Sequence, residues 1–96
     1  FVLAGRPGAM ERSFGSACHG AGRRLSRTAA RRAITGADVR RRLAAEGIVV
    51  SGASSAGLAE EVPFAYKDVE RVVGVVERAG LAARVARMVP LGVIKG

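Results

Sequence analysis

The residues best suited to chemistry lie together in the stretch GSACHGAGR, which runs from Gly15 to Arg23. This stretch contains the only histidine, His19, and the only cysteine, Cys18. A neutral imidazole is a good nucleophile toward phosphorus, and flanking glycines let backbone N–H groups approach a phosphate closely. Arg23 adds positive charge beside the histidine. The pattern predicts a phosphate-handling loop, although a lone surface histidine in a flexible loop explains the spacing equally well.

The same stretch limits the other kinds of site that can be considered. HGAGR matches neither the Walker A loop nor the GxGxxG fingerprint. One cysteine and one histidine cannot form a closed zinc site, which needs about four protein ligands. Side chains adjacent in sequence point in different directions, so we expect Cys18 to have a buried or packing role. We therefore expect no metal site built from this chain alone.

Composition and charge narrow the class of protein. The chain has 96 residues, enough for one small domain, and a formal net charge of +8. Such an excess of positive charge favours nucleic acids or nucleotides as partners. No apolar run approaches the roughly 20 residues that span a bilayer, and no signal peptide is visible. A single cysteine fits a reducing, cytoplasmic setting. The sequence begins without Met on the strand-like FVLAG, so we expect a piece of a larger protein.

Half of the basic residues lie between Arg23 and Arg42. We interpret part of this run as contacts to a phosphate backbone and part as a solvated helix face. Three consecutive arginines on a helix cannot all face one partner, so Arg40–Arg42 are expected to be solvated. The expected phosphate contacts are Arg23, Arg24, Arg27 and Arg31.

Apolar spacing and capping signals predict an α+β fold. In the first half of the chain, the expected elements are a strand at Phe1–Ala4, a turn at Gly5–Gly8, a helix from Arg24 or Leu25 with Ser26 as a possible cap, and a helix from Thr35 to about Glu46 with Val39 and Leu43 inward. A buried strand at Ile48–Val50, a flexible loop at Ser51–Gly57, one helical turn at Leu58–Glu61 stopped by Pro63, and a helix from Asp68 to about Gly80 are expected to follow. Leu81, Val85 and Met88 could form a helix stripe within Leu81–Ile94, but Pro90 and Leu91–Ile94 favour strands there. The stretch Glu11–Phe14 is expected to lead into the histidine loop. The first helix is expected to bury Leu25, Ala29 and Ala33.

Three further sites have ordinary explanations when they are considered alone. Tyr66 could cover the face of a base, but packing is the more common role of such a residue. Lys95, near the C-terminus, is normally a solvated tail residue. Glu60 and Glu61 are adjacent, so they do not face each other as an acid–base pair.

Together, GSACHGAGRRLSRTAARR, GIVV, AYKDV and the closing KG resemble the RtcB family of RNA-splicing ligases. The resemblance covers essentially the whole chain, in register with the C-terminal region of that family. It implies that residues 1–96 are the C-terminal portion of an RtcB-like ligase domain, without its N-terminal metal-binding part. The fold would be the C-terminal part of a mixed α+β structure and not a complete independent domain.

The resemblance also implies a reaction and a set of site residues. The family uses GTP and manganese to join an RNA 2′,3′-cyclic phosphate or 3′-phosphate end to a 5′-hydroxyl end, in tRNA splicing or RNA repair. A histidine carries GMP as a phosphoramidate, and an accessory activator protein is common. The implied residues are His19 as the nucleophile, Gly20, Ala21 and Gly22 around the guanylate, Tyr66 and Lys95 at the nucleotide, and Arg23 and Arg27 at phosphate or the RNA end. The manganese ligands of the family lie upstream, and Cys18 is not among them.

Two alternatives stay open on the sequence. One is a stand-alone basic module that binds nucleic acid, in which His19 is incidental. The other is a degenerate fragment with no function of its own. Whether it is a segment of a ligase or a degenerate fragment, this chain alone is expected to have no ligase activity.

Overall fold

The structure is a computed structural model that describes residues 1–95, and it has the predicted α+β fold. The chain folds as two compact units, each built from two separate segments. The first unit comprises residues 1–22 and 67–88, and the second comprises residues 23–66 and 89–96. The loop residues from Gly15 to Gly22, with His19, belong to the first unit, and the whole arginine run from Arg23 to Arg42 belongs to the second.

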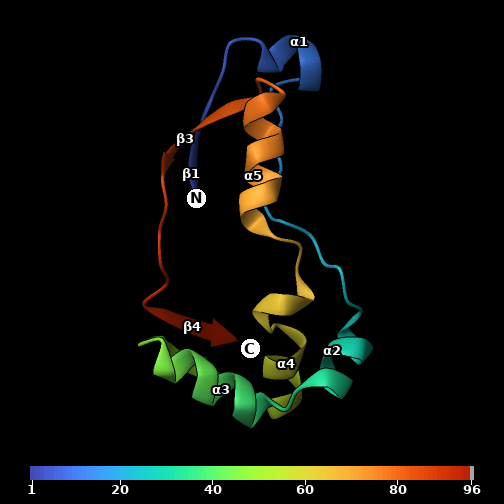
Figure 1. Cartoon of the computed structure of the whole chain (residues 1–96), viewed down its shortest axis with the longest axis vertical. Coiled ribbons are helices and arrows are strands. Elements are labelled where there is room, and N and C mark those ends of the chain that lie inside the picture. The colour runs from blue at the N-terminus through green and yellow to red at the C-terminus, as the bar shows by residue number, and fades with distance from the viewer. Residues whose placement is uncertain (96) are drawn as a thin grey trace. The chain divides into compact units, whose positions relative to one another are not determined.

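The first unit pairs two strands and contains two helices (Figure 1). Its elements are β1 (Val2–Gly5), α1 (Ala9–Ser13), α5 (Val69–Arg78) and β3 (Ala82–Ala86). Strands β1 and β3 are antiparallel, with Gly5 opposite Ala82. Strands β1 and β3 confirm the strands predicted at the start of the chain and after residue 81. The short helix α1 was not predicted, since residues 11–14 were expected only to connect to the histidine loop.

Helix α5 forms where the valine spacing predicts it. The Asp68 carboxylate accepts a hydrogen bond from the backbone N–H of Glu70 at 2.9 Å and so caps the first turn. Val73 and Val76 are buried, while Gly80 just beyond the helix has φ +70°. The apolar face of the helix therefore outweighs the preference of valine for strands.

The second unit is mostly helical. Its elements are α2 (Arg27–Ala33), α3 (Gly36–Ala45), β2 (Val49–Gly52), α4 (Ser55–Glu60), the 3₁₀ helix η1 (Pro63–Ala65) and β4 (Gly92–Lys95). Strands β2 and β4 are parallel, with Gly52 opposite Lys95. The Thr35 hydroxyl caps α3 by accepting from the Asp38 N–H at 3.2 Å, as predicted.

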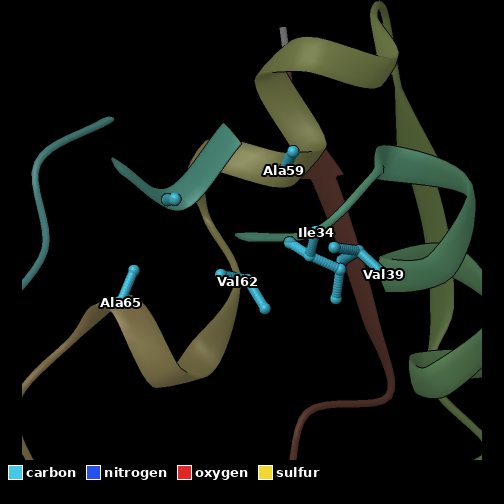
Figure 2. Packing of buried hydrophobic residues seen from close by; sticks show 6 residues of the cluster. Ile34, Val39, Ala59, Val62 and Ala65 are labelled. Carbon is cyan, nitrogen blue, oxygen red and sulfur yellow. The ribbon is translucent and has the colours of Figure 1, made fainter. Parts of the chain in front are cut away.

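The core of the second unit lies among its helices (Figure 2). Figure 2 shows Ile34 and Val39 next to each other, from the segments at the end of α2 and within α3. The buried residues of this cluster are Ala30, Ile34, Val39, Ala59, Val62 and Ala65. Leu25, Leu43 and Tyr66 pack against it. Three of these six residues are alanines, which lets the segments that carry them approach one another closely.

The prediction for the first helix was wrong about where the helix begins and about Ala33, whereas Leu25 does pack against the core. The backbone N–H groups of Arg24 and Leu25 both donate to the Ala65 carbonyl oxygen, at 2.9 and 3.1 Å. These bonds hold both residues outside the helix, which begins only after Ser26. Its buried position is consequently Ala30, with no exposure, while Ala33 is exposed.

The region from Ile48 to Pro63 also differs from the prediction. Strand β2 is not buried throughout, because Val49 is 73% exposed. The expected flexible loop after it is mostly ordered structure, since Ser54 caps α4 by accepting from the Gly57 N–H at 3.0 Å. Pro63 follows the helical turn and is also the first residue of η1. At the start of a helix its missing N–H is not needed for a hydrogen bond within the helix.

Gly36 gives a prediction about stability. A Cβ atom at this position would collide with the backbone oxygen of Ser55, where α3 begins beside α4. We expect Gly36→Ala to destabilise the full-length protein by about 1–3 kcal/mol, because neither backbone can move without disturbing the core. Thermal or urea unfolding measures this change. Gly8→Ala is the matched control, since no atom lies within 4 Å of its Cβ position, and an equal loss in both variants would contradict the argument.

Candidate functional site

The loop around His19 has an irregular backbone and is exposed. Gly22 adopts φ +76°, which favours glycine, and its carbonyl oxygen accepts from the Lys67 N–H at 2.9 Å. This bond ties the end of the loop to the segment that precedes α5. Within residues 1–95, neither ring nitrogen of His19 takes part in a hydrogen bond. The imidazole is therefore accessible, as a nucleophile or ligand must be.

His19 lies at a small hollow within the first unit. The hollow measures about 90 Å³ and is lined by Phe1, Leu3, Cys18, His19, Gly20, Ala21, Val69, Val72 and Val73. Ligand pockets usually measure about 300–1,000 Å³, so this hollow is too small to enclose a nucleotide. Its apolar walls come from the chain start, β1 and α5. It can form only one part of a nucleotide site.

The expected packing role of Cys18 was wrong. Its side chain is exposed and free, and it lines the same hollow as His19. The residues next to it in the loop form no helix or strand that could cover the thiol.

Arg23 and Tyr66 form a pair in the second unit. Their backbones make an isolated antiparallel bridge, and the Arg23 guanidinium lies 4.9 Å from the centre of the Tyr66 ring. Nη1 of Arg23 donates to the tyrosine hydroxyl at 3.1 Å, and Nε donates to the Leu25 carbonyl at 3.1 Å. Nη2 donates to the backbone oxygen of Glu60. All three guanidinium nitrogens are thus engaged inside the protein, which leaves fewer N–H groups for a phosphate.

Glu61 holds this pair together. Its carboxylate accepts a hydrogen bond from the Tyr66 hydroxyl and lies 3.6 Å from Nη1 of Arg23. The ammonium group of Lys95, at the end of β4, lies 3.7 Å from the same carboxylate. The hydrogen bond from Tyr66, and then the charges of Lys95 and Arg23, lower the pKa of Glu61. The bond to the carboxylate also raises the pKa of the Tyr66 hydroxyl.

The neighbouring Glu60 binds a different set of cations. Its two carboxylate oxygens each lie 3.3 Å from the Nε atom of an arginine on α2, one from Arg27 and the other from Arg31. These arginines are one helical turn apart, so a single carboxylate reaches both. Both remain largely exposed, at 66% for Arg27 and 48% for Arg31. A phosphate could therefore still reach them.

The second arginine cluster is solvated, as predicted. Arg40, Arg41 and Arg42 are all exposed on α3. Arg41 pairs with Asp38 one turn earlier, and Arg40 donates to the Val50 carbonyl at 2.6 Å. These contacts are local, and exposed pairs of this kind contribute little to stability.

The structure therefore groups the predicted site residues into two sets. His19, Gly20, Ala21 and Gly22 share the loop of the first unit. Arg23, Tyr66 and Lys95 meet at Glu61 in the second unit, where Arg27 lies beside Glu60. The sequence offered no role for either glutamate. Tyr66 follows Glu61 by only five residues, but no sequence pattern indicates that η1 turns the tyrosine hydroxyl back to the glutamate. Nor does any nearby pattern indicate that β4 brings Lys95 to the same carboxylate.

Two broader properties concern metals and membranes. Among residues 1–95, histidine, cysteine and acidic side chains nowhere gather in a group of three or more that could hold a metal ion. Within the same part of the chain, no helix has both the length and the apolar character needed to cross a bilayer.

Several known proteins are similar to this chain over all of its 96 residues. The family model described as "tRNA-splicing ligase RtcB" matches residues 1–96. Proteins named tRNA-splicing ligase RtcB are 56% identical in Pyrococcus abyssi, 55% in Thermococcus kodakarensis and 49% in Methanocaldococcus jannaschii, each over all 96 residues. The chain spans only 10%, 20% and 10% of those proteins, respectively. This chain belongs to the RtcB family of tRNA-splicing ligases.

Proposed function

We propose that the full-length protein is a GTP- and manganese-dependent RNA ligase of the cytoplasm. It joins RNA ends that carry a 2′,3′-cyclic phosphate or 3′-phosphate to ends with a 5′-hydroxyl, as in tRNA splicing or RNA repair. Residues 1–96 are the C-terminal portion of its ligase domain. Manganese would be held by residues outside this chain, and an accessory activator protein is an expected partner.

The exposed imidazole of His19 is the observation that carries this proposal. Its ring nitrogens have no hydrogen-bond partner within residues 1–95, and the side chain lines a hollow at the loop of a family member. One ring nitrogen attacks the α-phosphorus of GTP, an N–P bond forms, and pyrophosphate leaves. Where the RNA ends in a 2′,3′-cyclic phosphate, water first opens the ring to a 3′-phosphate. GMP then passes to the 3′-phosphate as the N–P bond breaks, and attack by the 5′-hydroxyl forms the new phosphodiester and releases GMP.

The remaining residues bind the reactants in this proposal. Gly20, Ala21 and Gly22 line the guanylate next to His19. Tyr66 and Lys95 bind the nucleotide, and the ring of Tyr66 has one face covered by the guanidinium of Arg23. A base can therefore stack only on the opposite face. Arg27 is proposed to bind phosphate at the RNA end.

RNA joining by the full-length protein tests the proposed reaction. The substrate is a pair of RNA strands, one ending in a 2′,3′-cyclic phosphate and the other beginning with a 5′-hydroxyl. We expect joined product only when both GTP and manganese are present, as seen on a denaturing gel. Strands with 3′-hydroxyl and 5′-phosphate ends are the control and should stay separate. Salt-sensitive RNA binding without joined product would instead support the binding-module alternative.

A further inference from the structure

We propose that Glu61 is a positioning residue that fixes Tyr66 and Lys95 for nucleotide binding and for the preference for guanine. The inference rests on the proposed function, which assigns Tyr66 and Lys95 to the nucleotide. It adds a residue that neither the resemblance nor the sequence pattern assigns. Its basis is the convergence of one hydroxyl donor and two cationic side chains on one carboxylate within the second unit.

The contacts of Glu61 come from three separate parts of the chain. The Tyr66 hydroxyl donates to its carboxylate from the end of η1, and Lys95 lies 3.7 Å away at the end of β4. Arg23 approaches to 3.6 Å from the segment before α2. The carboxylate is 24% exposed, so water screens these interactions only in part. One side chain therefore sets the position of both nucleotide-binding residues.

Each of the two residues needs such a constraint. Lysine carries its charge on a flexible four-carbon stem, and the Lys95 side chain is 43% exposed. An ion pair at one side of the ammonium limits its motion and leaves other N–H groups for a ligand, since an ammonium has three donors. The hydrogen bond that the Tyr66 hydroxyl donates to the Glu61 carboxylate restricts the orientation of the tyrosine ring in the same way. Binding then costs less conformational entropy.

The chemistry of the purine explains why Lys95 would favour guanine. Guanine presents two acceptors, O6 and N7, on one edge, whereas adenine presents an amino donor in place of O6. An ammonium held at this edge gains a hydrogen bond with guanine and meets a second donor with adenine. If Glu61 no longer holds Lys95, both the affinity for GTP and the discrimination against ATP should fall.

The test compares Glu61→Gln with the wild type in the full-length protein. Glutamine keeps the shape and still accepts from Tyr66, but it no longer attracts Lys95. Binding is measured with a GTP analogue that cannot be cleaved between the α- and β-phosphates, and covalent labelling is measured separately with GTP. We expect the Kd and the KM for GTP to rise about tenfold, with kcat for labelling nearly unchanged, since the Lys95 ammonium is no longer held where it would donate to the nucleotide. Selectivity for GTP over ATP should fall by a similar factor.

Two further variants keep the test specific to Glu61. Glu46→Gln removes an exposed carboxylate of the same unit and should leave Kd unchanged. Tyr66→Phe removes only the hydroxyl, and its effect should not add fully to that of Glu61→Gln if the two side chains act together. Thermal unfolding of each variant identifies any loss that comes from instability.

The outcomes separate this inference from the proposed reaction. An unchanged Kd, or a loss of kcat and thermal stability without a change in selectivity, would overturn the positioning role. Failure of the wild type to bind the analogue would also overturn it. If the wild type binds GTP but is never labelled covalently, the ligase proposal fails while the binding data still decide the role of Glu61.

Discussion

Replacement of His19 by alanine should abolish covalent labelling of the full-length protein by GTP. Removal of a nucleophile typically lowers the rate by about a thousandfold or more, because the covalent bond to phosphorus cannot form without the attacking nitrogen. The His19 side chain is exposed and makes no hydrogen bond within residues 1–95, so its loss should change stability by less than about 0.5 kcal/mol. The expected result is therefore a folded protein that cannot carry GMP.

The measurement uses GTP labelled at the α-phosphate, together with manganese. The phosphoramidate expected on a histidine is labile to acid and survives alkali, which distinguishes it from a phosphoester on a hydroxyl. Ser16→Ala is the control, because it changes an exposed residue of the same loop outside the hollow. Acid-labile GMP on His19→Ala would show that the nucleophile lies elsewhere.

Local signals were enough to predict most of the fold. Asp68, Ser26 and Thr35 each cap a helix where the sequence places a cap, and Gly47 with φ +76° follows the end of α3. These features depend on residues within one turn of each other. The errors have a different origin. The start of α2 is set by Ala65, about forty residues away in sequence, whose carbonyl holds Arg24 and Leu25 outside the helix.

The candidate site divides in the same way. The loop around His19 is continuous in sequence, so its unusual residue types were visible at once. The cluster around Glu61 joins segments that are distant in sequence, and adjacent glutamates usually suggest only a solvated surface. The structure shows that Glu60 and Glu61 face separate sets of cations. The parallel pairing of β2 with β4 positions Lys95 opposite Gly52 in the second unit, and no local sequence pattern predicts that pairing.

Replacement of Arg27 by glutamine should separate the RNA step from the nucleotide step. Arg27 is proposed to bind a phosphate at the RNA end, and its side chain stays 66% exposed despite the ion pair with Glu60. We expect RNA joining to fall about 10–100-fold, as for the loss of a hydrogen bond between charged groups. Labelling by GTP alone should be unchanged. RNA binding should also depend less on salt, with its logarithmic slope reduced by about 1.

The alternative explanation of such a loss is that Arg27 matters only for folding. The ion pair with Glu60 is exposed on the arginine side, and pairs of this kind contribute about 0–1 kcal/mol, so the variant should unfold at nearly the same temperature. Arg41→Gln is the matched control, since Arg41 is also exposed, also pairs with an acid and is expected to be solvated. Equal losses in the two variants would mean that general positive charge, and not a contact at Arg27, attracts the RNA. A parallel fall in GTP labelling would place Arg27 at the nucleotide instead, because labelling is measured without RNA.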